Sequence, residues 1–261
     1  MREPYQILVC ESMAQQTQAS RVAVAFDAWI ERFPTVKSLA TATRGDVLRA
    51  WQGLGYNRRA IALHEAARAI VADHGGVVPG DVDTLLTLPG VGPYTAAAVA
   101  SIAFGVPVVA MDTNIRRVAA RVLHGAEPDE LGAAPLREDA QAWLDTRDPG
   151  AWNQAVMDVG ASLCRPRSPR CAACPLHDLC RFRAAGRTGR SSVRPQPAFE
   201  GSVRQLRGAV VRLLSTDGPC SPDQVAQRTD VTAERLDPVL RALVGEGLIE
   251  RTAAGSLQLS P

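Results

Sequence analysis

The chain has 261 residues, a formal net charge of +2 and 46% hydrophobic residues. This length can form one large or two modest domains, and the composition is ordinary for a soluble globular protein. No apolar run approaches the roughly 20 residues that cross a bilayer, and the start, MREPYQILVCE, lacks the apolar core of a secretion signal. We therefore expect no membrane partner. Six cysteines without an export signal indicate a reducing compartment.

Helical periodicity runs through most of the sequence, which predicts an all-α fold up to about residue 185. Residues 184–203 are rich in Gly, Ser, Pro and Arg and predict a linker. Three helices and a small hairpin follow from Arg204 onward, which suggests a winged helix-turn-helix of α+β class. The main helices are expected at residues 5–26, 58–74, 95–104, 113–124 and 151–164.

A glycine-punctuated turn, LPGVG at residues 88–92, precedes a run of good helix formers. Because Gly90 and Gly92 lack side chains, the backbone there can approach a partner, and free N–H groups at a helix start suit a phosphate. Asp112 follows an apolar run, so we place it at the edge of a buried segment. The hypothesis is that the turn holds a DNA backbone and Asp112 acts on the DNA. Asp112 can also cap the helix that starts at Thr113.

Four cysteines cluster within seventeen residues, whereas Cys10 and Cys220 stand apart. Four thiolates at such spacing predict a metal site, and the spacing alone allows zinc or a 4Fe–4S cluster. Cys10 fits a small buried hydrophobe better than a ligand. The predicted ligands are Cys164, Cys171, Cys174 and Cys180.

Arginine is concentrated in one part of the chain. Residues 165–212 contain eleven arginines against two acids, Asp178 and Glu200. This excess indicates a nucleic-acid footprint, or else a solvated linker with arginine-rich codon usage. The codon bias is evident, since the chain has 28 arginines and one lysine, Lys37.

Together these motifs resemble one superfamily. The pattern Cys-x6-Cys-x2-Cys-x5-Cys, downstream of LPGVG and Asp112, is similar to the helix-hairpin-helix DNA glycosylases, and this resemblance implies a 4Fe–4S cluster on the cysteines rather than zinc. The segments ESMAQQTQ (11–18), GLGY (53–56), YTA (94–96) and MDVGA (157–161) resemble the adenine DNA glycosylase (MutY-type) branch.

The resemblance covers residues 4–183 and implies a two-lobed core followed by a separate C-terminal domain. Residues 17–121 would form the helical domain with the helix-hairpin-helix, and residues 1–16 and 122–183 the iron–sulfur lobe. Residues 184–203 would be the linker and residues 204–261 the winged-helix-like domain.

The resemblance also implies roles for four residues. Asp112 stabilises or attacks the oxocarbenium ion at the sugar, Glu11 protonates the departing adenine, and Tyr94 and Asn114 support the two carboxylates. The chemistry agrees, because breaking an N-glycosidic bond needs a proton for the base and a negative charge for the sugar. Glu11 follows an apolar run, so we expect burial to raise its pKa. The alternative for Glu11 is a salt-bridged helix acid.

A base inside a duplex must be flipped out before it can react. Gln16 matches the family position that inserts beside the flipped base. Two departures from the family affect this region: Asn57 stands where a second intercalating tyrosine is usual, and Ala14 where leucine lies against the adenine. The DNA-contacting residues implied by the resemblance are Gln16, Thr17, Gly53, Gly55, Tyr56, Leu88, Gly90 and Gly92.

Bifunctional relatives such as endonuclease III use a lysine where Tyr94 stands. A Schiff base needs an amine, and Lys37 lies elsewhere, so we expect no strand cleavage by β-elimination.

Only ten residues precede Glu11, fewer than in the family, so we expect a shortened N-terminus or a misassigned start. The C-terminal region is shorter than the NUDIX-like domain with which many members read 8-oxoguanine. The winged-helix-like region of this chain is expected either to pack against the rest of the protein and stabilise it or to contact the duplex.

The sequence thus predicts a monofunctional glycosylase that removes adenine opposite 8-oxoguanine or guanine. It would act as a monomer on mispaired double-stranded DNA in the bacterial cytoplasm, at the nucleoid. One alternative is a thymine or uracil mismatch glycosylase on the same scaffold. Another is a non-catalytic iron–sulfur DNA-binding regulator, which the retention of Glu11 and Asp112 argues against.

Overall fold

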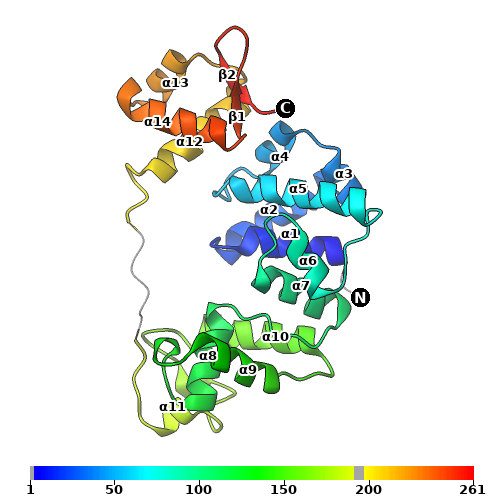
Figure 1. The fold of residues 1–261 in the computed structure, drawn as a ribbon. Coiled ribbons are helices and arrows are strands. Elements are labelled where there is room, and N and C mark those ends of the chain that lie inside the picture. Colours follow the sequence, from blue (N-terminus) through cyan, green and yellow to red (C-terminus); the bar gives the residue numbers. More distant parts are fainter. Residues whose placement is uncertain (1–2, 191–196) are drawn as a thin grey trace. The chain divides into compact units, whose positions relative to one another are not determined.

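The structure is a computed structural model that describes residues 3–190 and 197–261. Helices dominate these residues, and one two-stranded antiparallel sheet lies near the C-terminus (Figure 1). The predicted helical fold with a small α+β domain is therefore confirmed. The elements are α1 Pro4–Ala14, α2 Ala19–Arg32, α3 Val36–Ala40, α4 Arg44–Ala50, α5 Arg58–Asp73, α6 Val82–Thr87, α7 Pro93–Phe104, α8 Thr113–His124, α9 Ala133–Ala142, α10 Pro149–Asp158, α11 Arg181–Ala184, α12 Val203–Asp217, α13 Pro222–Thr229, α14 Ala233–Gly245, β1 Ile249–Arg251 and β2 Leu257–Leu259, with short 3-10 turns η1 Pro128–Glu130 and η3 Cys171–Ala173 and a π-helical turn η2 Val159–Leu163.

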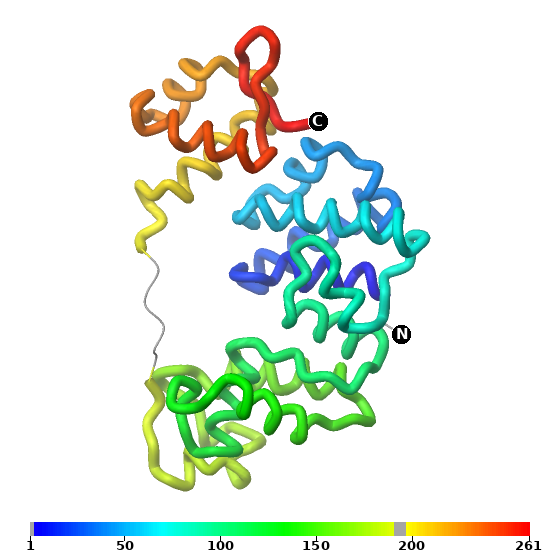
Figure 2. The backbone as a smooth tube through the Cα atoms, viewed as in Figure 1, coloured from blue at the N-terminus to red at the C-terminus, as the bar shows by residue number. Residues whose placement is uncertain are grey.

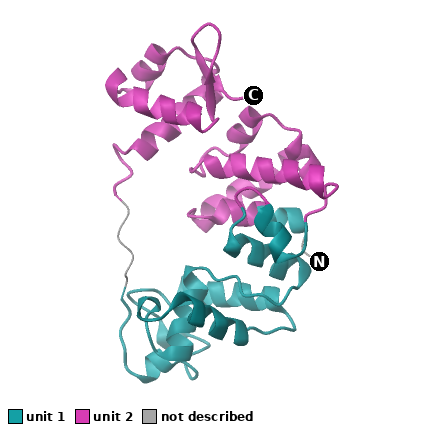
Figure 3. Cartoon of the chain, in the orientation of Figure 1, with its two compact units in different colours: residues 1–8, 79–87, 91–194 teal, residues 9–78, 88–90, 195–261 magenta. Residues whose placement is uncertain are grey.

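Contacts divide the chain into two compact units (Figure 3). The first unit contains the described residues of 1–8, 79–87 and 91–194, and the second those of 9–78, 88–90 and 195–261. The cysteine loop therefore shares a unit with α7 and α8, and the C-terminal domain shares one with α2 to α5 and with residues 9–14 of α1. The family-based boundaries at residues 17–121, 122–183 and 204–261 stay a prediction. Part of the predicted linker, residues 191–196, lies outside the described residues.

The first helix is shorter than the sequence predicts. A single helix over residues 5–26 is wrong, because α1 ends at Ala14 and α2 begins at Ala19. Gln16 between them has φ of 55°, in the left-handed region, and Gln18 is extended at the start of α2. A left-handed residue interrupts the helical hydrogen bonds. The glutamine-rich run is thus an exposed turn rather than a polar face of one helix.

In the first unit, α8 is the central amphipathic helix. Its apolar face carries Ile115, Val118 and Val122, which pack with Leu136 of α9 and Val156 of α10. Helix α7 is apolar on all sides, as expected for a buried helix, and it packs on α10. Left-handed glycines end both α7 and α8, at Gly105 and Gly125.

In the second unit, α5 packs on α3 and α4, and Trp29 contacts Trp51 edge to face at 5.4 Å between ring centroids. The C-terminal domain follows the predicted order of three helices and a hairpin, which ends the chain in red in Figure 2. Ile249 pairs with Leu259 across that hairpin. Helix α12 packs on α4, where Gln52 donates a hydrogen bond to Ser215 Oγ at 3.0 Å.

Candidate functional site

Asp112 is fixed at the start of α8 by two hydrogen bonds. Its Oδ1 accepts from the Ile115 backbone N–H at 2.6 Å, and its Oδ2 accepts from Asn114 Nδ2 at 2.8 Å. The predicted helix cap is therefore confirmed. Because both oxygens are held, the half-buried carboxylate has one orientation, as electrostatic stabilisation of a developing cation requires.

The contacts of Asn114 continue to the cysteine loop through Arg117. Arg117, 9% exposed, donates from Nη2 to Asn114 Oδ1 at 2.8 Å and to the Gly160 carbonyl at 2.6 Å. Its Nε donates to the Cys164 carbonyl at 2.6 Å. Burial lowers the pKa of Arg117, although an arginine stays protonated. A continuous chain of hydrogen bonds therefore joins Asp112 to the first cysteine of the loop.

The turn η2 approaches α8 closely at Gly160. A Cβ on Gly160 would lie 2.5 Å from Asn114 Cβ, so only glycine allows this approach. Turn η2 is π-helical, and such turns occur frequently at functional sites. The MDVGA motif thus has a packing role beside the carboxylate.

Tyr94 lies in the first turn of α7 in the same unit. Its hydroxyl is 3.6 Å from Met157 Sδ, and the two side chains pack against Ala97, Ala98 and Ala110. Met157 also packs against the α8 core. Lys37, the one lysine of the chain, lies on α3 in the other unit, so α7 offers a phenol and no amine at this position.

The two glycines of the LPGVG turn have different roles. Gly90 has φ of 74°, and a Cβ there would lie 2.5 Å from Ala62 Cβ, so its close approach is to α5. Gly92 is the N-cap residue of α7, and a Cβ there would meet no atom within 4 Å. Pro93 takes the first helical position, which needs no donor. Open N–H groups at the start of α7 remain suited to an anion.

The remaining predicted site residues lie in the second unit. Glu11 is half-buried on α1. Gln16 and Thr17 lie in the turn between α1 and α2, and Gly53, Gly55 and Tyr56 form the turn before α5. The structure brings these two turns together through Arg59, whose guanidinium donates to Thr17 Oγ1 at 3.0 Å and to the Gly55 carbonyl at 3.3 Å.

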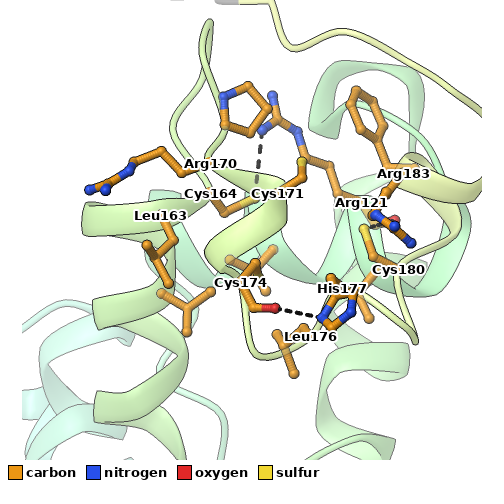
Figure 4. A pocket seen from close by; sticks show the side chains of 15 residues that line it. Arg121, Leu163, Cys164, Arg170, Cys171, Cys174, Leu176, His177, Cys180 and Arg183 are labelled. Atoms are coloured by element: carbon orange, nitrogen blue, oxygen red, sulfur yellow. Dashed lines mark hydrogen bonds between the residues drawn. The ribbon is translucent and has the colours of Figure 1, made fainter.

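The four predicted ligands surround one cavity in the first unit (Figure 4). All four thiols are free and half-buried, and apolar side chains such as Leu176 and Phe182 line the cavity with them. A 4Fe–4S cluster takes one thiolate on each iron, so the four thiols around this cavity supply the number and kind of ligands that such a cluster needs.

Arg121 supports this loop from α8. Its side chain is 1% exposed, pairs with Glu127 at 2.8 Å and lies 4.8 Å from the centre of the Phe182 ring. It donates to Cys164 Sγ at 3.5 Å and to the Arg165 carbonyl at 2.8 Å. Burial raises the pKa of the Cys164 thiol, and the positive charge of Arg121 opposes that rise. A bound cluster would cross-link this loop through its thiolates.

Some of the arginine excess is engaged within the protein. Arg187 pairs with Glu130 at 2.6 Å and holds the pKa of that carboxyl at about 2, while Arg190 pairs with Asp129 at 3.1 Å. Exposed arginines lie within the cysteine loop and directly after it, at Arg165, Arg167, Arg170, Arg181 and Arg183. Arg194 lies outside the described residues.

The sequence did not reveal the roles of Arg59, Arg117, Arg121 and Gly160. The three arginines act through partners distant in the chain, and an arginine-rich composition hides them. One signal was present: Arg117 and Arg121 are four residues apart, so they share one face of α8 and can both reach the cysteine loop.

Comparison with known proteins places the chain in a family. Residues 9–134 match the model of the HhH-GPD superfamily base excision DNA repair proteins, and residues 164–180 match the iron–sulfur binding domain of endonuclease III. An adenine DNA glycosylase of Mycolicibacterium smegmatis is 44% identical over 260 residues, which are 98% of this chain and 87% of that protein.

Solved structures support the same assignment. A thermostable thymine-DNA glycosylase is 31% identical with a TM-score of 0.66, covering 71% of this chain and 86% of that one. A non-covalent endonuclease III–DNA complex shares the fold, with 24% identity, a TM-score of 0.62, and 72% of this chain and 88% of that one covered.

These matches confirm the iron–sulfur prediction, because the family model that covers all four cysteines is that of an iron–sulfur binding domain. Within the described residues, no helix is both long and apolar enough to cross a membrane. The family model, the mycobacterial relative and the arrangement of Asp112 beside the cysteine loop agree, and the chain belongs to the HhH-GPD superfamily of base excision DNA repair proteins.

Proposed function

We propose that this protein is a monofunctional adenine DNA glycosylase that acts on adenine mispaired with 8-oxoguanine or guanine. The observation that carries the proposal is the Asp112 carboxylate, held by Ile115 and Asn114 in a chain that is 44% identical to an adenine DNA glycosylase over nearly its whole length. The contact with Ile115 caps α8, and the contact with Asn114 fixes the second oxygen of the carboxylate as well.

The reaction breaks the bond between adenine and the sugar C1′, and the electron pair leaves with the base. Glu11 supplies the proton that the departing base requires. Asp112 stabilises the cationic sugar, or attacks it, before water adds at C1′; the proton that the water loses restores the acid form of Glu11. Tyr94 offers no amine for a Schiff base, so the products are free adenine and an intact abasic strand.

The DNA partner is supported by the open N-terminus of α7 and by the exposed arginines around the cysteine loop. The similar endonuclease III structure was solved with DNA. Gln16, Thr17, Gly53, Gly55 and Tyr56 would contact the duplex in the second unit, and Leu88, Gly90 and Gly92 would form the helix-hairpin-helix turn. The enzyme would act as a monomer in the bacterial cytoplasm.

Single-turnover base release tests this function. The substrates are duplexes carrying A opposite 8-oxoguanine, A opposite G, T opposite G and U opposite G. We expect release of adenine without strand cleavage, and loss of release in Asp112→Asn with duplex binding retained. Unchanged turnover in Asp112→Asn would contradict the role of Asp112.

A thymine or uracil mismatch glycosylase is the second candidate. It is favoured by the similarity to a thymine-DNA glycosylase. Release of T or U but not A from these duplexes would establish it instead.

A further inference from the structure

Arg59 joins two turns that are distant in the sequence. Its Nη1 donates to the carbonyls of Ser12 at 2.9 Å and Met13 at 3.1 Å, and also to the Gln15 carbonyl. The acceptors of Nη2 are Thr17 Oγ1 at 3.0 Å and the carbonyls of Leu54 and Gly55, each at 3.3 Å. One guanidinium is therefore hydrogen-bonded to the end of α1, to the turn that follows it and to the turn before α5.

Two aromatic rings hold the guanidinium from the sides. The Arg59 carbon Cζ lies 5.5 Å from the centre of the Trp51 ring and 5.4 Å from that of Tyr56. Trp51 in turn donates from Nε1 to the Gly55 carbonyl at 3.0 Å. All six acceptors of Arg59 are neutral oxygens, and burial lowers its pKa. Its role is thus to bind carbonyl groups in a fixed fork, which the compact ammonium of lysine cannot reproduce.

The two turns contain unusual backbone conformations. Among described non-glycine residues, positive φ occurs at Gln16 (55°), Tyr56 (50°) and Asp230 (54°), so two of the three lie in the turns that Arg59 joins. Such conformations cost free energy and persist only where surrounding contacts impose them. Tyr56 is also 45% exposed. Arg59 contacts the residues on both sides of Gln16, namely Gln15 and Thr17, and it also contacts the ring of Tyr56.

We propose that Arg59 is a positioning residue that sets the relative geometry of the Gln16 turn and the Gly53–Tyr56 turn, and thereby the step in which the target base is extruded. The inference rests on the proposed function, in which these two turns contact the duplex around the flipped base. It assigns Arg59 no contact with DNA and no part in the bond-breaking step.

Arg59→Lys tests the proposal, with the exposed neighbour Arg58→Lys as a matched control of equal charge. Base extrusion is followed by the fluorescence of 2-aminopurine placed opposite 8-oxoguanine, and base release by single turnover on the adenine duplex. In Arg59→Lys we expect extrusion and release to slow by about 10- to 100-fold, as a displacement of roughly 1 Å causes. Arg58→Lys should keep wild-type rates.

Hydrogen exchange distinguishes a local effect of Arg59 on the Gln16 turn from a general loss of folding stability and from a failure of the proposed function. In Arg59→Lys the amides of residues 15–18 should exchange faster, while the melting temperature and the visible iron–sulfur absorption stay at wild-type values. Wild-type exchange and rates in Arg59→Lys would overturn the proposal. Equal losses in Arg58→Lys would also overturn it, because they would show that any arginine in this segment is needed and not the contacts of Arg59. Lower melting with faster exchange throughout the second unit would also overturn it. If wild-type protein releases no base, the proposed function fails, and the exchange at residues 15–18 still decides the role of Arg59.

Discussion

Replacing Gly160 with alanine should damage both stability and activity, because η2 packs directly on the first turn of α8. The added Cβ would lie 2.5 Å from Asn114 Cβ and 3.0 Å from Asn114 Cα. Ordinary carbon contacts lie at about 3.5–4.0 Å, so the two segments must separate by roughly 1 Å. Overpacking of this kind costs about 1–3 kcal/mol of unfolding free energy.

The same displacement reaches the carboxylate. Asn114 holds Asp112 Oδ2 at 2.8 Å, and Arg117 holds both Asn114 and the Gly160 carbonyl. Moving Asn114 by roughly 1 Å should therefore reorient Asp112 and lower the single-turnover rate by about 100-fold. Duplex affinity should change little, since neither Gly160 nor Asn114 is assigned a DNA contact.

Gly208→Ala is the matched control. Gly208 lies within α12, and a Cβ there meets no atom within 4 Å. We expect this variant to gain about 0.5–1 kcal/mol, because alanine is the better helix former, and to keep its rate. Urea unfolding followed by circular dichroism gives the stabilities. If Gly160→Ala matches wild type in stability and rate, the inference that this contact fixes Asp112 is refuted.

Two further predictions follow from buried titratable side chains. Arg121→Met leaves the Glu127 carboxylate buried without its ion-pair partner, so we expect the free energy of unfolding to fall by about 3–5 kcal/mol and the iron content per chain to fall as well. Urea denaturation and metal analysis measure these two effects. Wild-type stability and iron content in this variant would contradict the prediction. Burial, followed by the charge of Arg68, lowers the pKa of His64 from its ordinary value of 6.5. The unfolded state therefore binds a proton first as pH falls, so the stability due to neutral His64 is complete above pH 6.5 and declines below it toward the lower folded pKa. Urea titrations between pH 8 and pH 5 should show a shallower decline in His64→Gln, and identical slopes would exclude His64 as the cause.

Features set by local sequence could be predicted, and those set by distant partners could not. The helical periodicity, the cap at Asp112 and the four cysteine ligands depend on neighbouring residues or on fixed spacing. The end of α1 at Ala14 could not be predicted from neighbouring residues, because the glutamines that follow favour a helix locally. Arg59, more than forty residues away, takes the carbonyls that a continued helix would have used.

Gly90 and Gly160 show a related difference. Each was noticed inside a motif, and the sequence assigned Gly90 to an approach by DNA. The structure shows both glycines in contact with helices of the same chain, at Ala62 and Asn114 respectively. A missing side chain indicates that something lies close, but the sequence does not say whether that neighbour is a partner or the protein itself.

Helix α8 explains how a cluster with no assigned place in the chemistry can still affect activity. Its first turn orients Asp112, its apolar face is buried in the core, and its third face carries Arg117 and Arg121. Both arginines bind the segment at Cys164, through the carbonyl and the thiol respectively. Loss of the cluster would free that segment, at a cost of about 1–3 kcal/mol for each hydrogen bond that the two arginines lose to it. Arg117 would then be held by α8, through Asn114 and the Thr113 carbonyl. Because Asn114 also holds Asp112, a shift of the Arg117 side chain would be transmitted to the carboxylate.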